Sequence, residues 1–399
     1  MRVADPEGYR YATEEKVNRR IDSFPPDERE LVREYINTSR AQKGIKLVRV
    51  VGIIAGLKAW RDIIKKPFQK WTRNDVYQGV TFVRDKKNYK QNTAIIYIAL
   101  MKAFLTWMIT EKYSKIPLEE IIKIQLPKGD TGSFKPGDIL TEEEVRTILS
   151  CCGSDRDRAL IALLYDGGFR MVEAAMMTWG DLDFQFDDRI TARTSQKTYV
   201  PRVVSLMSCK ELIATWRSHY PGNPVGDNPV FVTRDGEPFT YSTATEVIKS
   251  IRLKAIKKGL DPKRIKLHQF RRASITHEVN KGRPISHICI ERWGRAYSPM
   301  IEVYAKPSEQ DVLRSKMEMF GVEPKRKYEK RKTAMTPTQC QHCGFINSPE
   351  IEFCGKCGKP LSEEALTEIE ILRRERDMAL DLVNKAYKEG KLDLKEITR

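Results

Sequence analysis

One aperiodic stretch divides this chain and limits the folds open to it. Residues 126–138 read LPKGDTGSFKPGD, which is rich in Gly, Pro and Asp and indicates a linker. Before this linker, apolar residues recur at spacings of three and four with few strand signals, so we expect a small helical domain over residues 1–125. The expected helices are Asp27–Arg40, Ile45–Ile64, Thr72–Lys86 and Gln91–Tyr113.

A second domain is expected over residues 139–322. Thr141 with Glu144 three residues later forms a capping box, which indicates the start of a new helix. Helices are predicted over Asp155–Tyr165, Met171–Thr178 and, in pieces, Ser242–Phe320; strands are predicted over Arg189–Thr194 and Tyr199–Leu206, joined by the turn 195–198. The chain is therefore predicted to be mainly α with a small antiparallel sheet.

Four cysteines beyond a basic linker over residues 323–336 have the spacing of a metal site. They form two Cys-x-x-Cys pairs separated by ten residues: Cys340, Cys343, Cys354 and Cys357. Two such pairs give four thiolates for one Zn²⁺ and leave no open position, so we predict a structural zinc ribbon over residues 337–361 and no metal in catalysis. The remaining segment, 362–399, has the pattern of an amphipathic helix that can pair with another helix.

The charge of the chain favours a polyanionic partner. Lys and Arg number 71 against 54 Asp and Glu, a formal charge of +17, and 399 residues allow two or three domains. We expect double-stranded DNA as the partner, since basic surfaces gain affinity by releasing counterions, although a basic helix face can also be merely solvated. The basic residues of the helical domain are Arg40, Lys43, Lys46, Arg49, Lys58, Arg61, Lys65, Lys66, Lys70 and Arg73.

The sequence also bears on where the protein acts. The N-terminus has no apolar segment after its charges, and no membrane span is expected. The chain is neither small nor rich in unassigned cysteines, so disulfides are not expected. We therefore expect a cytoplasmic, DNA-associated protein.

Five residues supply what a metal-free DNA-cleaving site needs. A phosphodiester is an anion, so two guanidinium groups, those of Arg170 and Arg271, are needed to neutralise the charge that develops on its oxygens. A tyrosine hydroxyl, that of Tyr304, can then attack phosphorus, while His268 and Lys197 move the protons. His268 and Arg271 lie three residues apart, which places them on one face of a helix.

These segments resemble the tyrosine recombinase (phage integrase) family over about residues 138–320. The resemblance rests on four pieces in order: LIALLYDGGFRMVEAAMMTWGDLDF, TSQKTYVPRVV, LHQFRRASITHEVNKG and ERWGRAYSPMIEVYAK. The segment before residue 126 also resembles the family's helical SAM-like core-binding domain. The resemblance implies an α+β catalytic domain, a C-shaped clamp around DNA, strand exchange through a 3′ phosphotyrosine and a Holliday junction, and four protomers on two DNA sites. The zinc ribbon would be an addition expected of an archaeal member.

The resemblance also implies roles for single residues. Arg170 and Arg271 would clamp the phosphate, and Glu173 would orient Arg170 or its neighbours. Lys197, at the tip of a hairpin, would protonate the departing 5′ oxygen. His268 would accept or return the proton of Tyr304, the nucleophile.

Arg295 departs from the family pattern, which has His or Trp at this position. An arginine can also donate hydrogen bonds to a phosphate oxygen, so phosphate binding should survive, while uniform binding does not accelerate chemistry. Three alternatives to a recombinase therefore stay open: a topoisomerase-like nicking and resealing enzyme, a DNA-binding regulator disabled by Arg295, and an interaction adaptor that works through its ribbon and tail.

Overall fold

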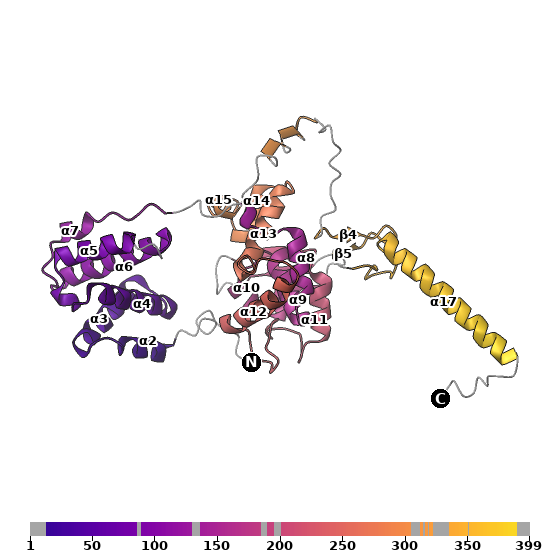
Figure 1. The fold of residues 1–399 in the computed structure, drawn as a ribbon, viewed down its shortest axis with the longest axis horizontal. Helices are drawn as coiled ribbons and strands as arrows, with labels where there is room; N and C mark the ends of the chain where they lie inside the picture. The colour runs from indigo at the N-terminus through magenta and orange to yellow at the C-terminus, as the bar shows by residue number, and fades with distance from the viewer. Residues whose placement is uncertain are drawn as a thin grey trace. The chain divides into compact units, whose positions relative to one another are not determined.

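The computed structural model describes residues 13–85, 89–129, 136–184, 190–194, 201–304, 312–313, 316–317, 319–321, 335–349 and 351–388. Backbone contacts divide the chain (Figure 1) into two compact units. The first comprises Met1–Asp138, Val232–Ala244 and Pro299–Lys306; the second comprises Ile139–Phe231, Thr245–Ser298 and Pro307–Arg399. The domain boundaries drawn from the sequence stay predictions, because compactness alone gives this different division.

The N-terminal part of the first unit is helical, as predicted. Its helices are α2 (Glu14–Ile21), α3 (Pro26–Lys43), α4 (Leu47–Ile64), α5 (Arg73–Asp85), α6 (Gln91–Thr110) and α7 (Leu118–Ile122). Helices α3 to α6 are the predicted ones, with ends shifted by up to three residues. Helices α2 and α7 were not predicted, because eight and five residues carry too little periodicity. The same unit contains α15 (Ile301–Tyr304).

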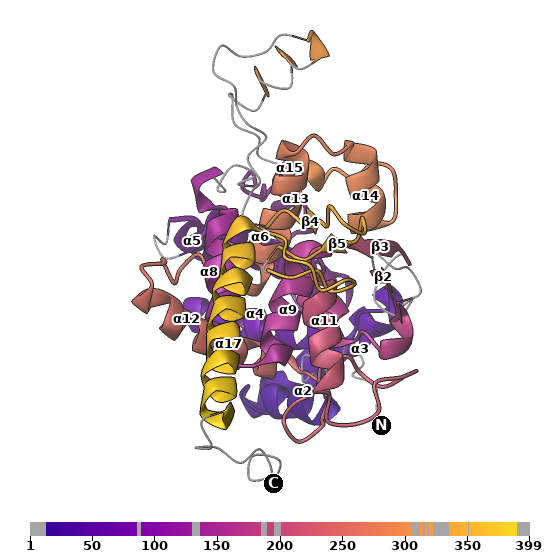
Figure 2. The same cartoon turned by 90° about the vertical axis from the view of Figure 1, so that its right-hand side faces the viewer.

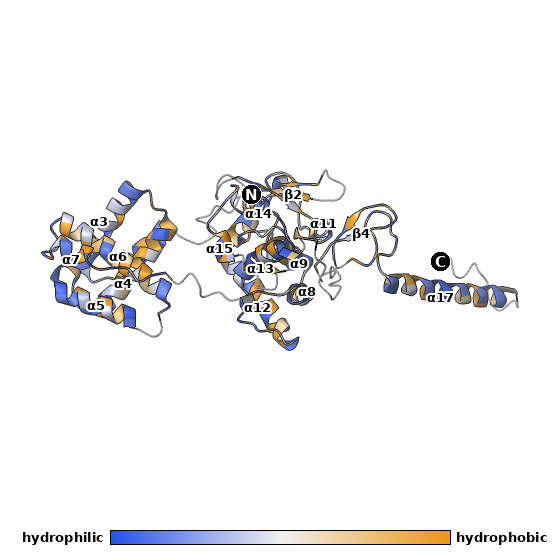
Figure 3. Cartoon of the chain, turned by 90° about the horizontal axis from the view of Figure 1, so that it is seen from above, coloured by the Kyte–Doolittle hydropathy of each residue, from blue (hydrophilic) through white to orange (hydrophobic). Residues whose placement is uncertain are grey.

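Aromatic side chains fill the core of the first unit. The ring of Phe68 lies 4.9 Å from that of Phe104 and 5.1 Å from that of Trp71, in edge-on geometry. Close approach of α4 and α6 depends on Gly56, where an added Cβ would lie 2.2 Å from Leu100. Apolar residues gather on these two helices (Figure 3), and each fully buried large side chain stabilises the fold by about 1.5–3 kcal/mol.

Among the described residues, one helix is long and apolar enough to cross a bilayer by length and composition. This is α6, and its Ile98, Met101, Phe104, Leu105 and Met108 belong to the core of the first unit. The helix therefore reads as the central helix of a packed domain.

The second unit is built around α9 (Asp155–Asp166), whose residues 159–165 are all buried. Helices α8 (Glu142–Ser150), α10 (Met171–Ala175), α11 (Lys210–Ser218) and α13 (Leu267–Asn280) pack against it, and α9 and α11 lie side by side in Figure 2. Two further helices are α12 (Tyr241–Lys257), which begins in the first unit, and α14 (Ile285–Trp293). The predicted capping box is present: Thr141 Oγ1 accepts the N–H of Glu144, whose carboxylate accepts the N–H of Thr141.

A small antiparallel sheet covers part of this unit. Its strands, in spatial order, are β1 (Leu182–Asp183), β2 (Ile190–Arg193) and β3 (Val203–Leu206), with Ala192 opposite both Leu182 and Val204. Strand β1 was not predicted, and the helix expected to reach Thr178 ends at Ala175. Thr178 instead caps a 3₁₀ turn, with its N–H and hydroxyl both bonded to Asp181. The mainly α fold with small antiparallel sheets is confirmed.

The C-terminal part of the second unit holds the cysteines. Strands β4 (Thr338–Gln339) and β5 (Ile346–Asn347) pair beside them, and α17 (Glu363–Lys388) follows. Two contacts attach this segment to α11: Lys210 Nζ lies 3.4 Å from the centroid of the Phe345 ring, and Ser348 Oγ donates to Glu211.

Candidate active site

A tight turn at the end of α9 sets the position of Arg170. Gly168 has φ +55°, which favours glycine, and Arg170 is the N-cap of α10. Glu173 accepts the backbone N–H of Arg170 at 2.8 Å and its Nη1 at 2.9 Å. The Glu173 side chain is fully buried, whereas that of Arg170 is 27% exposed. One carboxylate thus holds both the backbone and the side chain of Arg170, and the guanidinium keeps a face open to solvent.

Glu173 is shared with a second arginine. Arg202 donates to its carboxylate from Nη1 at 3.2 Å and Nη2 at 2.7 Å, and donates from Nε to the carbonyl of Glu291 at 2.6 Å. Burial by itself raises the pKa of Glu173, but the hydrogen bonds and charge of Arg202, followed by the charge of Arg271, bring the pKa below its ordinary value. Glu173 is therefore ionised and compensates the guanidinium groups around it.

Arg271 on α13 reaches back to the same turn. Its side chain is fully buried; Nη1 donates to the carbonyl of Gly168, and Nη2 donates to the carbonyl of Arg292 at 2.9 Å. The guanidinium carbon lies 5.3 Å from the centroid of the Trp293 ring, within the range of a cation–π contact.

His268 lies in the first turn of α13, where nearby arginine charges affect its pKa. Its side chain is exposed, yet the protein around the ring removes part of its hydration, and the guanidinium groups of Arg272, Arg271 and Arg170 oppose a further positive charge. Together they lower the pKa of His268 from 6.5 to about 4. The ring is therefore neutral at pH 7.

Arg295 follows the end of α14. Gly294 caps this helix in the left-handed conformation, with φ 70°, and Trp293 before it is 7% exposed. The side chain of Arg295 is exposed to solvent. The turn therefore separates a buried tryptophan from an exposed arginine.

The structure groups neither Tyr304 nor Lys197 with these residues. Tyr304, the last residue of α15, is 5% exposed, and backbone contacts group Pro299–Lys306 with the first unit. Lys197 lies outside the described residues, between the paired strands β2 and β3. The structure thus brings Arg170, Glu173, His268 and Arg271 together in the second unit.

The four cysteines form a candidate metal centre. Their sulfur atoms all lie within 4.8 Å of one another, with Cys340 and Cys357 at 3.6 Å and Cys343 and Cys354 at 3.6 Å. Four thiolates bonded to zinc at about 2.3 Å would lie roughly 3.8 Å apart, so the donors fit a tetrahedral ion. Each pair turns back through a glycine of positive φ, Gly344 or Gly358. Among the described residues this is the one such cluster.

Sequence reasoning missed the buried charges that support the site. Asp166 accepts the N–H groups of residues 207, 208 and 209, which joins the end of α9 to the start of α11, and burial raises its pKa. Arg202 and Arg292 are also buried, and Arg292 pairs with Glu278. The available signal was a charged residue at a position where the helical or strand pattern calls for an apolar one.

Comparison with known proteins identifies similar chains. The model of the phage integrase family matches residues 138–310. A protein named tyrosine recombinase XerC from Pelotomaculum thermopropionicum is 24% identical over 49% of this chain and 65% of its own length. A tyrosine recombinase XerC from Staphylococcus aureus is 23% identical over 57% of this chain and 77% of its own length. The solved Tn1549 transposon integrase, in complex with a circular intermediate DNA, has a TM-score of 0.54 at 18% identity and covers 72% of this chain and 98% of its own.

Proposed function

Through residues 138–310 the chain belongs to the phage integrase family, the tyrosine-type site-specific recombinases, and we propose that it cleaves and rejoins DNA through a phosphotyrosine at Tyr304. One observation carries the assignment of its site. Arg271 Nη1 donates to the carbonyl of Gly168, two residues before Arg170, so two arginines that lie far apart in the sequence meet at one turn, with His268 on the same helix as Arg271.

The proposed reaction begins with attack of the Tyr304 oxygen on a DNA phosphorus. The bond from phosphorus to the 5′ oxygen breaks, and a 3′ phosphotyrosine forms. His268, neutral at pH 7, takes the tyrosine proton, and Lys197 gives a proton to the departing 5′ oxygen. A free 5′ hydroxyl from a second strand then attacks the phosphotyrosine and releases Tyr304, so the bond energy is conserved.

The charge that develops on the phosphate is met by arginines. Arg170, partly exposed and held by Glu173, offers a planar guanidinium to two phosphate oxygens. Arg271 adds a fixed positive charge, and Arg295, exposed beyond α14, donates a further contact. Glu173 and Arg202 hold this arrangement before DNA arrives, so little reorganisation is needed during the reaction.

The proposed partner is double-stranded DNA, as in the solved relative. The exposed residues Lys43, Lys46, Arg49, Lys58 and Lys70 of the helical unit suit contacts to the phosphate backbone, which position a protein without reading sequence. Four of the predicted basic residues have structural partners instead: Arg40 pairs with Glu14, Arg61 with the buried Glu28, Lys66 with Asp75 and Arg73 with Glu120. We propose a cytoplasmic, DNA-associated protein that acts as a tetramer on paired sites.

The cysteine cluster is proposed to hold one structural Zn²⁺. Four thiolates complete the coordination of the ion, so it would stabilise the fold of this segment and leave no open position for substrate. Cleavage is therefore assigned to the arginines, His268, Lys197 and Tyr304 alone.

A strand-exchange assay tests the function. Nicked duplexes with a randomised central segment are incubated with the protein, DNA that stays attached under denaturing conditions is sequenced, and two copies of the recovered site are placed in one supercoiled plasmid. A recombinase deletes or inverts the DNA between the sites, and Arg170→Ala, as the matched control, does neither. Relaxation of the plasmid supercoils without exchange of DNA strands would indicate a topoisomerase-like enzyme. DNA binding without covalent attachment would indicate a DNA-binding regulator.

A further inference from the structure

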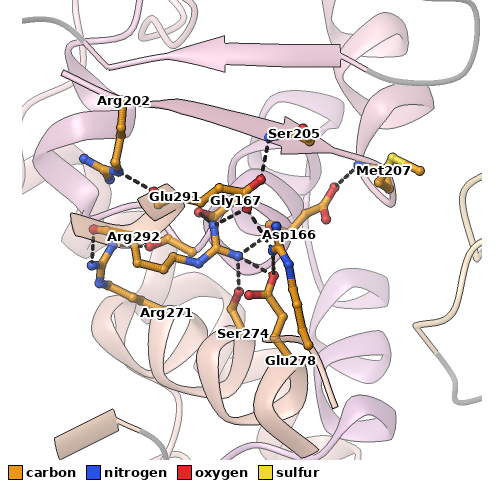
Figure 4. A network of polar contacts seen from close by, with 12 residues as sticks. Asp166, Gly167, Arg202, Ser205, Met207, Arg271, Ser274, Glu278, Glu291 and Arg292 are labelled. Atoms are coloured by element: carbon orange, nitrogen blue, oxygen red, sulfur yellow. Dashed lines mark hydrogen bonds and ion pairs between the residues drawn. The ribbon is translucent and has the colours of Figure 1, made fainter. Parts of the chain in front are cut away.

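Arg292, near the end of α14, is a buried arginine with several acceptors. Its side chain is fully buried, and Nη1 donates to the carbonyl of Gly167. Nη2 lies 3.1 Å from the carbonyl oxygen of Asp166, 3.2 Å from Ser274 Oγ and 2.6 Å from Glu278 Oε1. Figure 4 shows these side chains converging from α9, α13 and α14. A group that reaches no solvent is placed to act on the protein rather than on DNA.

The first effect of Arg292 falls on the turn that precedes Arg170. The two carbonyls that Arg292 bonds belong to the last residue of α9 and to Gly167, three residues before Arg170. The backbone at Gly168 has φ +55°, and an added Cβ there would lie 2.7 Å from Arg292 Nε. The guanidinium therefore packs directly beneath the turn and fixes its carbonyls.

The second effect falls on Arg271. The backbone carbonyl of Arg292 accepts Arg271 Nη2 at 2.9 Å, while Arg271 Nη1 donates to Gly168. A closed ring results: Arg271 spans from the turn to Arg292, and the side chain of Arg292 spans back to Gly167. Movement of Arg292 would displace both ends of the Arg271 guanidinium.

We propose that Arg292 is a positioning residue that sets Arg170 and Arg271 together through the turn at 166–168. The role rests on the proposed function of those two arginines. Glu278 compensates the buried charge of Arg292, and it lies seven residues beyond Arg271 on α13.

The test replaces the ion pair of Arg292 and Glu278 by apolar residues. Arg292→Met alone would leave Glu278 buried beside a lost partner and so confuse positioning with stability, whereas Arg292→Met with Glu278→Leu removes both charges. Arg292→Lys, which keeps a charge for Glu278 but lacks the planar fork, is the conservative variant. The matched control is Arg264→Met, since Arg264 also bonds a carboxylate and a carbonyl in the second unit, those of Glu144 and Ile139. Circular dichroism fixes a temperature at which every variant is folded.

The first readout needs no DNA. Burial and the charges of Arg272, Arg271 and Arg170 lower the pKa of His268, so ¹³C-histidine NMR titration responds to movement of Arg271 and Arg170. The His268 midpoint is expected near 4 in the native protein and in Arg264→Met, and higher in the apolar pair variant but below 6.5, because burial and Arg272 still act there; Arg292→Lys should lie between the native protein and the pair variant. A pair variant that titrates like the native protein would overturn the positioning role.

The second readout is single-turnover cleavage of a nicked duplex bearing the selected site. The folded pair variant is expected to lose about 100-fold in cleavage rate with DNA affinity unchanged, because small displacements of catalytic groups have effects of this size. Cleavage at the native rate would also refute the positioning role. If the native protein itself fails to cleave, the proposed function is wrong, and the titration still decides whether Arg292 sets the two arginines.

Discussion

Glu173→Gln is the substitution that most sharply probes the support of the proposed phosphate site. The native carboxylate is fully buried and accepts from the backbone and Nη1 of Arg170 and from Nη1 and Nη2 of Arg202. Glutamine keeps the shape, but it turns an amide NH₂ toward guanidinium donors and removes the one negative charge between them. The 2%-exposed side chain of Arg202 is then a buried charge without its partner.

The expected magnitude follows from this burial. Breaking a buried ion pair by removing one partner costs about 3–5 kcal/mol. For a domain of roughly 150–250 residues each kcal/mol corresponds to roughly 2–4 °C, so the melting temperature of the second unit should fall by roughly 6–20 °C. Because the pKa of Glu173 is lowered in the folded protein, the stabilisation is present above its ordinary pKa of 4.5 and is lost as pH falls through the folded value. The difference in melting temperature between the native protein and Glu173→Gln should therefore be largest at pH 7 and become smaller below pH 4.5.

Thermal unfolding followed by circular dichroism measures this effect. The matched control is Glu246→Gln, because Glu246 also pairs with a basic residue, Lys249, but both side chains are more than half exposed. This control should change the melting temperature little. If Glu173→Gln melted like Glu246→Gln at pH 7, the buried carboxylate would not be holding Arg170 and Arg202, and the reasoning would be wrong.

Three further predictions follow from the same contacts. The pKa of His268 is about 4 in the folded protein and 6.5 in the unfolded one, so the unfolded state binds a proton first as the pH falls, and the free energy of unfolding decreases. His268→Gln lacks this proton, so its free energy of unfolding, measured by urea titration, should decrease less between pH 6.5 and 4 than that of the native protein. Gly168→Ala should lower the melting temperature and slow cleavage, because φ +55° and the 2.7 Å approach to Arg292 leave no room for a Cβ; unchanged unfolding and cleavage would contradict both points. Elemental analysis should find one zinc per chain, lost in Cys340→Ser with Cys343→Ser, while cleavage by residues 1–324 persists without metal; native protein without zinc would refute the ribbon.

Local patterns in the sequence were sufficient for the elements that local physics decides. Periodicity located α3 to α6, and the Thr141 capping box located the start of α8. The cysteine spacing located the four-cysteine cluster, because two short knuckles bring their thiols together with little help from the rest of the chain. Short elements such as β1 were missed, since two residues carry no period.

The supporting charges could not be predicted, because their partners lie far away in the sequence. Arg292 bonds the carbonyl of Gly167 across 125 positions, and Arg202 bonds Glu173 across 29. A buried arginine is stable only where tertiary structure brings acceptors to it, and although the pattern of α14 places Arg292 on the same face as Ile288, it does not say which acceptors those are. The role of Arg295 stays a prediction for a related reason: its side chain is exposed beyond the helix cap, where its contacts depend on DNA.

The central claim is a covalent bond between Tyr304 and DNA, and mass mapping of the attached peptide tests it most directly. Native protein is incubated with a nicked duplex bearing the selected site, digested with protease and nuclease, and the peptide that carries a nucleotide is identified. Tyr297→Phe serves as the matched control, since Tyr297 is 61% exposed and only seven residues away. We predict that the nucleotide lies on Tyr304, that Tyr297→Phe forms the same adduct, and that Tyr304→Phe forms none while binding DNA normally. An adduct on Tyr297, or undiminished attachment by Tyr304→Phe, would contradict the account.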